Sequence, residues 1–463
     1  MQYVSTRGNA PALSFADAMM TGLARDGGLY VPETIPQISA DDIRGLDGLS
    51  YEDAALRIIG PFIGDSFSQD ELTQAIRRAY QTFGHAARAP LVQLAPRHFM
   101  LELFHGPTLA FKDFAMQLIG QLFQIALSRE GRRITIVGAT SGDTGSAAIE
   151  AFRGLPNVDV FIMYPHGRVS EVQRRQMTTP DDANVHALAI SGTFDDAQAR
   201  LKDLFNDHDF RDRVGLAGVN SINWARVLAQ VVYYFTAAAS LGAPDRRVSF
   251  TVPTGNFGDI FAGSIARAMG LPIDRLVIAT NQNDILDRAL TTGEYRVGRV
   301  EPSVSPSMDI QVSSNFERAL YFAYDGDAAA VRALMDELQT SGGFTISQGA
   351  LQHLREIYDS GRVSEAETLS TIARVRAETG QVVCPHTAVG IKVADERRTP
   401  DTTMVTLSTA HPAKFPDAVE QAIGVRPPLP PHMARLFDLP ERVTRVENDP
   451  EAIKSLILER RPA

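Results

Sequence analysis

The feature that most constrains the fold is an alternation of short apolar runs with amphipathic segments from about residue 130 onward. The runs are of strand length and apolar on both faces, as the strands of a buried parallel sheet are. They occupy residues 134–137, 158–164, 185–190, 248–252, 276–280 and 404–407. Amphipathic stretches predict helices at residues 146–153, 195–206, 224–241 and 260–269. The alternation therefore predicts an α/β fold with parallel sheets flanked by helices.

The length of 463 residues favours two or three domains. We expect an N-terminal helical region over residues 1–95, an α/β domain over 96–245, and a second α/β domain with a C-terminal extension over 246–463. Residues 310–395 are expected to be mostly helical, and the proline run at 427–431 predicts a stiff connection before a short tail. Internal repeats and low-complexity tracts are absent from the sequence.

Charge and cysteine content exclude several functional classes. The net charge is −10, which argues against a nucleic-acid partner and against an anionic membrane surface. Cys384 is the only cysteine, so an intramolecular disulfide and a multi-cysteine zinc site are excluded, as suits a reducing compartment. The start of the chain lacks the pattern of a signal peptide, and no apolar stretch approaches 18 residues. We expect a cytoplasmic protein without a metal site.

Lys112 is the first candidate for chemistry. It is one of only five lysines among 45 basic residues, and Phe111 and Phe114 flank it. Burial lowers the pKa of a lysine and leaves a neutral amine, which arginine cannot become. Such an amine forms a Schiff base with an aldehyde such as pyridoxal phosphate. The alternative, a lysine that extends from an amphipathic helix into solvent, is about as consistent with the local sequence.

Three loops rich in small and polar residues directly follow predicted strands, at residues 138–145, 254–259 and 408–414. Ligands gather outside the carboxyl ends of the strands in open α/β sheets, so the three loops predict a single site. The first two contain glycines before a predicted helix, where free backbone N–H groups bind anions. Each could instead be an ordinary tight connection. Neither is a P-loop, and the spacing of Gly138, Gly142 and Gly145 is not that of a dinucleotide-binding loop.

A fourth polar cluster, residues 220–226, precedes a predicted helix. Its polar side chains can cap that helix. Asn220, Ser221 and Arg226 could also bind a phosphate, with the arginine as a bidentate donor. Trp224, the single tryptophan, is interpreted as a packing residue.

Several segments together resemble the threonine synthase family, in its longer form. The segment from Glu102 to Ala115 is similar to the lysine-attachment signature of the serine/threonine dehydratase group of pyridoxal-phosphate enzymes. Further similar segments span nearly the whole chain, at residues 3–8, 26–32, 105–108, 141–145, 220–226, 255–259 and 385–390. One departure is Cys384, where the family pattern has an acidic residue before Pro385 and His386.

The resemblance implies a fold-type II pyridoxal-phosphate enzyme, similar to the tryptophan synthase β subunit. Such an enzyme would convert O-phospho-L-homoserine and water to L-threonine and phosphate by γ-elimination and β-addition. Lys112 would carry the cofactor. The other implied cofactor contacts are Gly255, Asn256, Phe257, Gly258 and Asp259 around its phosphate and Thr409 at its pyridine nitrogen. The implied substrate contacts are Ser141, Asp143 and Thr144 near the carboxylate, and Asn220, Ser221, Arg226, Lys414 and His105 near the phosphate.

Two rival readings stay open at this stage. A threonine/serine dehydratase shares the fold but needs no phosphate contact for its substrate. A protein that only binds the cofactor would need no reactive lysine. We expect a small-molecule substrate, and either a monomer or a homodimer.

Overall fold

The structure is a computed structural model that describes residues 1–140 and 142–461. Its larger sheet has six strands in the order β13-β10-β9-β14-β4-β3. All neighbours pair in parallel except β3 and β4, which are antiparallel. The strands span Tyr358–Arg362 (β13), Ile273–Thr280 (β10), Val248–Pro253 (β9), Thr403–Ser408 (β14), His98–Glu102 (β4) and Leu91–Ala95 (β3).

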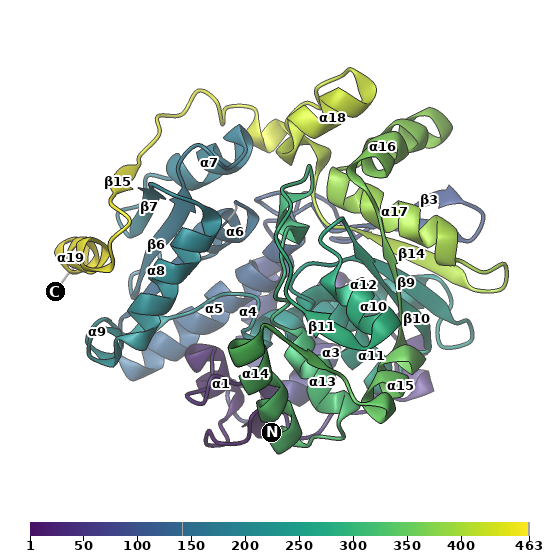
Figure 1. Cartoon of the computed structure of the whole chain (residues 1–463), viewed down its shortest axis with the longest axis horizontal. Helices are drawn as coiled ribbons and strands as arrows, with labels where there is room; N and C mark the ends of the chain where they lie inside the picture. The colour runs from purple at the N-terminus through teal and green to yellow at the C-terminus, as the bar shows by residue number, and fades with distance from the viewer. Residues whose placement is uncertain (141, 462–463) are drawn as a thin grey trace.

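A second sheet of five parallel strands has the order β15-β7-β6-β5-β8. Its strands span Thr444–Val446 (β15), Val185–Ile190 (β7), Val158–Pro165 (β6), Ile134–Ala139 (β5) and Leu216–Ala217 (β8). Every residue of β6 is buried, as its uninterrupted apolar run predicts. The two sheets lie on opposite sides of the molecule in Figure 1. The predicted α/β class and the six predicted strands are confirmed.

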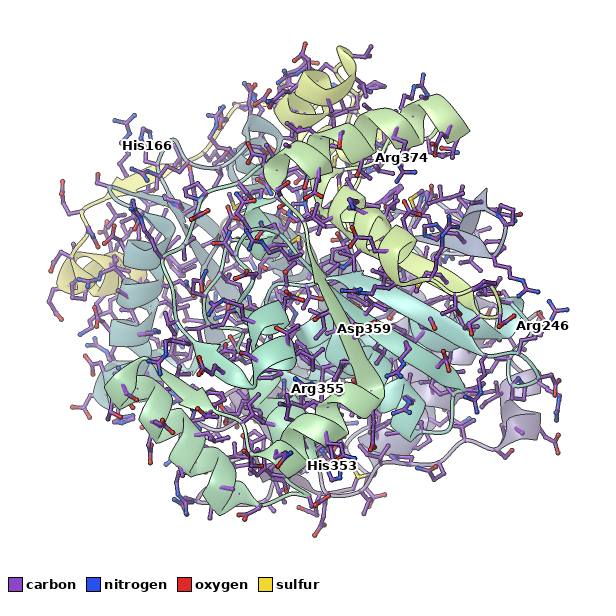
Figure 2. All side chains as sticks on the ribbon, turned by 45° about the vertical axis from the view of Figure 1, so that its right-hand side comes forward. His166, Arg246, His353, Arg355, Asp359 and Arg374 are labelled. Carbon is purple, nitrogen blue, oxygen red and sulfur yellow. The ribbon has the colours of Figure 1, made fainter. Side chains whose placement is uncertain are left out.

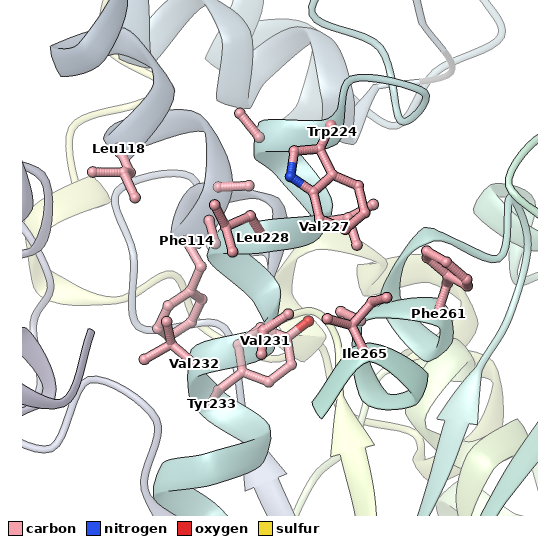
Figure 3. Packing of buried hydrophobic residues seen from close by; sticks show 14 of the residues in the cluster. Phe114, Leu118, Trp224, Val227, Leu228, Val231, Val232, Tyr233, Phe261 and Ile265 are labelled. Atoms are coloured by element: carbon pink, nitrogen blue, oxygen red, sulfur yellow. The ribbon is translucent and has the colours of Figure 1, made fainter. Parts of the chain in front are cut away.

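The centre of the molecule is occupied by α10 (Trp224–Ser240), a helix that is buried along nearly its whole length. It packs against α5 (Lys112–Glu130), α11 (Gly258–Ala268) and α3 (Tyr51–Ile63). Figure 3 shows Phe114 and Leu118 of α5 close to apolar side chains of α10. Trp224 is 1% exposed and lies in this core, so its interpretation as a packing residue is confirmed.

The N-terminal region is mainly helical, as predicted. A short antiparallel pair joins β1 (Tyr3–Ser5) to β2 (Tyr30–Pro32). The remaining helices there are α1 (Phe15–Thr21), α2 (Ala40–Arg44) and α4 (Gln69–Tyr80). Serine side chains cap the helices of this region, and Ser68 and Glu71 form a full capping box on α4.

The other helices connect and cover the two sheets. Those next to the five-stranded sheet are α6 (Asp143–Phe152), α7 (Glu171–Thr178), α8 (Phe194–Asn206), α9 (His208–Val214) and α19 (Pro450–Arg460). The rest are α12 (Ile285–Thr292), α13 (Phe316–Ala323), α14 (Ala328–Ser341), α15 (Gln348–Ile357), α16 (Glu365–Thr379), α17 (Pro385–Arg397) and α18 (Pro416–Ile423), with a strand pair β11 (Glu294–Arg296) and β12 (Gly343–Thr345). Figure 2 labels several polar side chains of the surface, of which His166, Arg246 and His353 are exposed.

Strand pairing links the three predicted segments to one another. β3, from the segment 1–95, pairs with β4, which in turn pairs with β14 near the C-terminus. After the proline run the chain crosses to the five-stranded sheet, where β15 pairs with β7 (Figure 1). β15 can pair with β7 although the two are distant in sequence, because an edge strand leaves N–H and C=O groups unpaired that any extended segment can bind. The boundaries at 95 and 245 thus separate strands that share a sheet.

Candidate active site

A cavity of about 380 Å³ opens where the predicted loops meet. Its wall includes Lys112 at the start of α5 and Thr409 directly after β14. It also includes most of the other predicted site residues, namely Asp143, Thr144, Asn220, Ser221, Arg226, Gly255, Asn256, Phe257, Gly258 and Asp259. The convergence of loops that are distant in sequence follows from the shared position of the carboxyl ends of parallel strands.

Lys112 lies at the wall of this cavity with a side chain that is 11% exposed. Its Nζ is 3.3 Å from Asp143 Oδ2 and 5.0 Å from the centre of the Phe111 ring. Burial lowers the pKa of Lys112; Asp143 opposes that shift, and the positive charges of Arg226 and Lys414 add to it. The environment therefore favours a neutral amine at Lys112 more than water does.

Asp143 is the first residue of α6, and four side chains surround its carboxylate. Oδ1 is 2.9 Å from Lys414 Nζ and accepts a hydrogen bond of 2.9 Å from Gln173 Nε2. Oδ2 faces Lys112 and accepts a hydrogen bond of 3.2 Å from the Ser307 hydroxyl. Burial alone would raise the pKa of Asp143, but Lys414 and Lys112 hold it well below its usual value. Asp143 is therefore a carboxylate with a permanent negative charge.

The loop after β9 presents backbone N–H groups at the start of α11. Phe257 has φ of 64°, and the N–H groups of residues 255–258 have no acceptor within the described part of the chain. A Cβ added to Gly255 would lie 2.6 Å from the backbone oxygen of Ser307, so only glycine fits there. Free N–H groups at a helix N-terminus bind an anion such as a phosphate. The loop fits the phosphate group of pyridoxal phosphate.

Asp259, in the first turn of α11, contacts two tyrosines of α10. The Tyr233 hydroxyl makes a short hydrogen bond to Oδ1, and the Tyr234 hydroxyl donates to the backbone oxygen at 3.0 Å. Burial raises the pKa of Asp259 to about 7, although both tyrosines oppose the shift. Because its side chain faces α10 in these contacts, Asp259 braces the two helices.

Arg226 is 3% exposed and lies in the first turn of α10. Its Nη1 donates to the backbone oxygen of Val219 at 3.1 Å, and within the described residues its Nε has no acceptor and no carboxylate pairs with it. Burial lowers the pKa of Arg226 to about 10. A buried guanidinium without a carboxylate partner favours the binding of an anion. The cap of α10 is made by Asn223, which accepts from the N–H of Ala225 at 3.0 Å.

Thr409 is 6% exposed, and its backbone oxygen accepts a hydrogen bond of 2.9 Å from the N–H of Phe111. This bond ties the end of β14 to the start of α5, beside Lys112. Thr409 and Lys112 both line the cavity.

Two predicted site residues lie outside the cavity wall. His105 Nε2 is 2.7 Å from Glu102 Oε2, and its ring is 5.0 Å from that of His85. Lys414 is fully buried behind Asp143, where its Nζ also donates to the backbone oxygen of Thr108 at 2.8 Å. Neither side chain is placed to contact a ligand in the cavity directly. Ser141 lies outside the described residues.

His386 lines the cavity, although sequence reasoning gave it no role. It is 3% exposed, and its Nε2 accepts a hydrogen bond of 3.2 Å from the N–H of Ser307. Burial lowers the pKa of His386 to about 4, so the ring is neutral. The segment 385–390 carries part of the family resemblance, and this was the only signal in the sequence.

Three family models match the chain, and together they extend from residue 2 to residue 457. Residues 2–80 match the family model "Threonine synthase N terminus", residues 82–410 match "Pyridoxal-phosphate dependent enzyme", and residues 387–457 match "Threonine synthase, C-terminal". A threonine synthase of Pseudomonas aeruginosa is 51% identical and covers 99% of this chain and 98% of its own length. One from Saccharomyces cerevisiae is 42% identical, with 99% and 97% covered.

A solved structure agrees with these sequence matches. The pyridoxal-phosphate-bound threonine synthase of Brucella melitensis is 55% identical, with a TM-score of 0.97 and full coverage of both chains. The protein is thus a fold-type II pyridoxal-phosphate-dependent enzyme, as the fold and the cavity with its buried lysine indicate. More narrowly, the chain belongs to the threonine synthase family. The predictions of family, enzyme class and cofactor are confirmed.

Among the described residues, no group of three or more His, Cys, Asp or Glu side chains could hold a metal ion. No helix in this part of the chain is long and apolar enough to span a membrane.

Proposed function

We propose that the enzyme converts O-phospho-L-homoserine and water to L-threonine and phosphate in the cavity beside Lys112. One observation carries the proposal: the cavity that holds Lys112 also holds two separate anion-binding features. These are the N–H groups of residues 255–258 and the guanidinium of Arg226, which have no acceptor and no carboxylate partner, respectively, among the described residues. A phosphorylated cofactor and a phosphorylated substrate need one such feature each.

The residues around Lys112 suit pyridoxal phosphate. Lys112 Nζ would attach it covalently, and residues 255–258 would bind its phosphate through backbone N–H groups. The Thr409 hydroxyl would lie at the pyridine nitrogen, where a neutral group does not favour protonation of the ring. When bound, the cofactor supplies an electron sink for negative charge at the substrate's Cα.

Asn220, Ser221 and Arg226 would bind the phosphate of the substrate, because side chains suit an anion that enters and leaves. Thr144, in the first turn of α6, would bind the carboxylate. Asp143 was expected near that carboxylate as well, but two carboxylates repel each other. Its contacts with Lys112 and Lys414 instead suit a counter-ion that holds the Lys112 amine in place.

Proton transfer at the substrate falls to Lys112. Its pKa is lowered, so the released amine can take a proton from Cα and return it later. Protons leave Cα and Cβ, phosphate leaves Cγ, and Cγ gains a proton. The hydroxyl of water then adds at Cβ, and Cα regains a proton. Arg226 would stabilise the charge that develops on the leaving phosphate.

A dehydratase is the runner-up activity. It eliminates at Cβ and needs no second anion site, so the buried Arg226 favours the phosphorylated substrate. A monomer or homodimer in the cytoplasm stays our prediction for the protein's state and location.

The test is to supply purified enzyme with O-phospho-L-homoserine and to measure phosphate and L-threonine together. We expect equal amounts of both products from wild type and none from Lys112→Arg, because arginine forms no imine. Borohydride reduction followed by peptide mapping should place the cofactor on Lys112. A 2-oxo acid formed from threonine, without phosphate release from the phosphorylated substrate, would identify a dehydratase instead.

A further inference from the structure

Asn315 contacts both loops that we assign to phosphate groups. It is fully buried at the start of α13, and its Nδ2 donates to the backbone oxygen of Ser221 at 3.0 Å and to that of Asn256 at 3.0 Å. Its backbone N–H donates to the same Asn256 oxygen at 3.1 Å. A single side chain thus joins the loop before α10 to the loop before α11.

Arg318, one turn along α13, holds Asn315 in this orientation. Its Nη1 makes a short hydrogen bond to Asn315 Oδ1, and its Nη2 donates to the backbone oxygen of Ile222 at 2.6 Å. Two further bonds, of 3.1 and 2.9 Å, reach the backbone oxygen of Tyr30. Because Oδ1 accepts from the guanidinium, the amide nitrogen of Asn315 must face the two loops.

The contacts use carbonyl oxygens, and this sets the direction of the neighbouring N–H groups. In a planar trans peptide the C=O and the following N–H point in opposite directions. Asn315 holds the oxygens of Ser221 and Asn256, and the Ser313 hydroxyl holds that of Gly255 at 2.7 Å. The N–H groups of Ile222, Asn256 and Phe257 therefore point away from residues 313–318.

We infer that Asn315, locked by Arg318, is a positioning residue that fixes the spacing of the two anion-binding loops and turns the N–H groups of Asn256 and Phe257 toward the phosphate of the cofactor. The inference rests on the proposed function, since it assigns one phosphate to each loop. Asn315 acts through the two backbones and touches neither phosphate. Neither residue belongs to a motif near the reactive lysine.

The experiment compares three single variants of the holoenzyme. Asn315→Asp keeps the shape of the side chain but replaces both N–H donors with an oxygen that faces two carbonyl oxygens. Ser313→Ala removes only the contact with Gly255. Asn184→Asp is the matched control, because Asn184 Nδ2 also joins backbone oxygens, those of Phe152 at 2.9 Å, Val158 at 2.8 Å and, more weakly, Leu155 at 3.4 Å. Asn184 is far from either loop in sequence.

Three quantities are measured for each variant: the dissociation rate of pyridoxal phosphate, the Kd of inorganic phosphate for the holoenzyme by calorimetry, and Tm. For Asn315→Asp we expect the dissociation rate and the Kd each to rise about tenfold, as the loss of buried hydrogen bonds implies. Ser313→Ala should raise only the dissociation rate, by about threefold. The control should lower Tm and leave both other quantities unchanged.

Two outcomes overturn the inference. One is a stable Asn315→Asp protein with the wild-type dissociation rate of pyridoxal phosphate and the wild-type Kd of inorganic phosphate. The other is an Asn184→Asp control that weakens the binding of both ligands as strongly as Asn315→Asp does. The effect would then come from a general loss of stability and not from the two loops. If Asn315→Asp does not fold, Ser313→Ala decides: an equal loss of binding of both ligands in that variant contradicts the inference. Wild type that binds both ligands as expected but releases no phosphate from O-phospho-L-homoserine would refute the proposed function alone.

Discussion

Lys112 Nζ lies 3.3 Å from Asp143 Oδ2, and the opposite oxygen of that carboxylate is 2.9 Å from Lys414 Nζ. Three charged groups in this arrangement carry a net charge of +1 when both lysines are protonated. Since Lys414 already neutralises Asp143, the carboxylate stabilises a proton on Lys112 less than it would alone. Lys414 therefore influences the reactive amine without contact with the cavity.

Lys414→Met should raise the pKa of Lys112, because Asp143 would then have Lys112 as its only nearby cation. Because the amine is free only after substrate has bound, we expect the acid limb of kcat against pH to move upward by about one unit. Lys392→Met is the control, since Lys392 is paired with Glu396 on the outer side of α17. A limb at the same pH in wild type and Lys414→Met would show that Lys414 has only a structural role.

Thr409→Asp should alter the electronic state of the cofactor. A carboxylate beside the pyridine nitrogen favours its protonation, whereas the threonine hydroxyl does not. We expect a changed absorption spectrum of the holoenzyme and a larger share of side products relative to L-threonine. Thr409→Ser keeps the hydroxyl and serves as the control. Identical spectra and product ratios in Thr409→Asp and wild type would place the residue away from the ring nitrogen.

The elements of the fold followed from local patterns, but their assembly did not. Each of the six apolar runs became a strand with ends shifted by a few residues at most, because apolar runs bounded by turn residues are local signals. The pairing of β15 with β7 depends on a segment more than 250 residues away, and no local pattern encodes it. The same holds for β4 and β14.

The candidate site likewise contains residues that local sequence motifs could predict and residues that they could not. Lys112 and residues 255–258 were recognisable because each sits in a local motif directly after a strand or before a helix. The family resemblance implied that Lys414 lies near a phosphate, yet the structure turns its amine toward Asp143 behind the cavity. Asn315 has no motif at all, and its importance comes from the meeting of three distant backbones.

His98 should make stability sensitive to acid. It is 2% exposed, with Nε2 2.9 Å from the Thr406 hydroxyl, and burial lowers its pKa to about 4. The unfolded chain protonates this histidine below about pH 6.5. Its contribution to the free energy of unfolding is therefore present above pH 6.5 and lost as the pH falls toward 4, by about 3 kcal/mol.

His98→Gln should remove that pH dependence, because glutamine does not titrate. The free energy of unfolding measured in urea between pH 4 and 7 should fall less steeply for this variant than for wild type. His208→Gln, at an exposed position on α9, should leave the wild-type slope unchanged. Parallel curves for His98→Gln and wild type would mean that the acid sensitivity comes from other groups.

Arg226→Ala should separate the two anion sites. Loss of a charge-assisted contact is worth about 1.5–3 kcal/mol, so we expect kcat/KM for O-phospho-L-homoserine to fall by about one to two decades. Arg226→Lys keeps the charge but not the bidentate geometry, and its loss should be smaller. Bound cofactor, measured by absorbance after dialysis, should stay near the wild-type level in both variants, because residues 255–258 hold that phosphate. An Arg226→Ala enzyme that loses its cofactor, yet turns over substrate normally once reconstituted, would show that the two sites are exchanged.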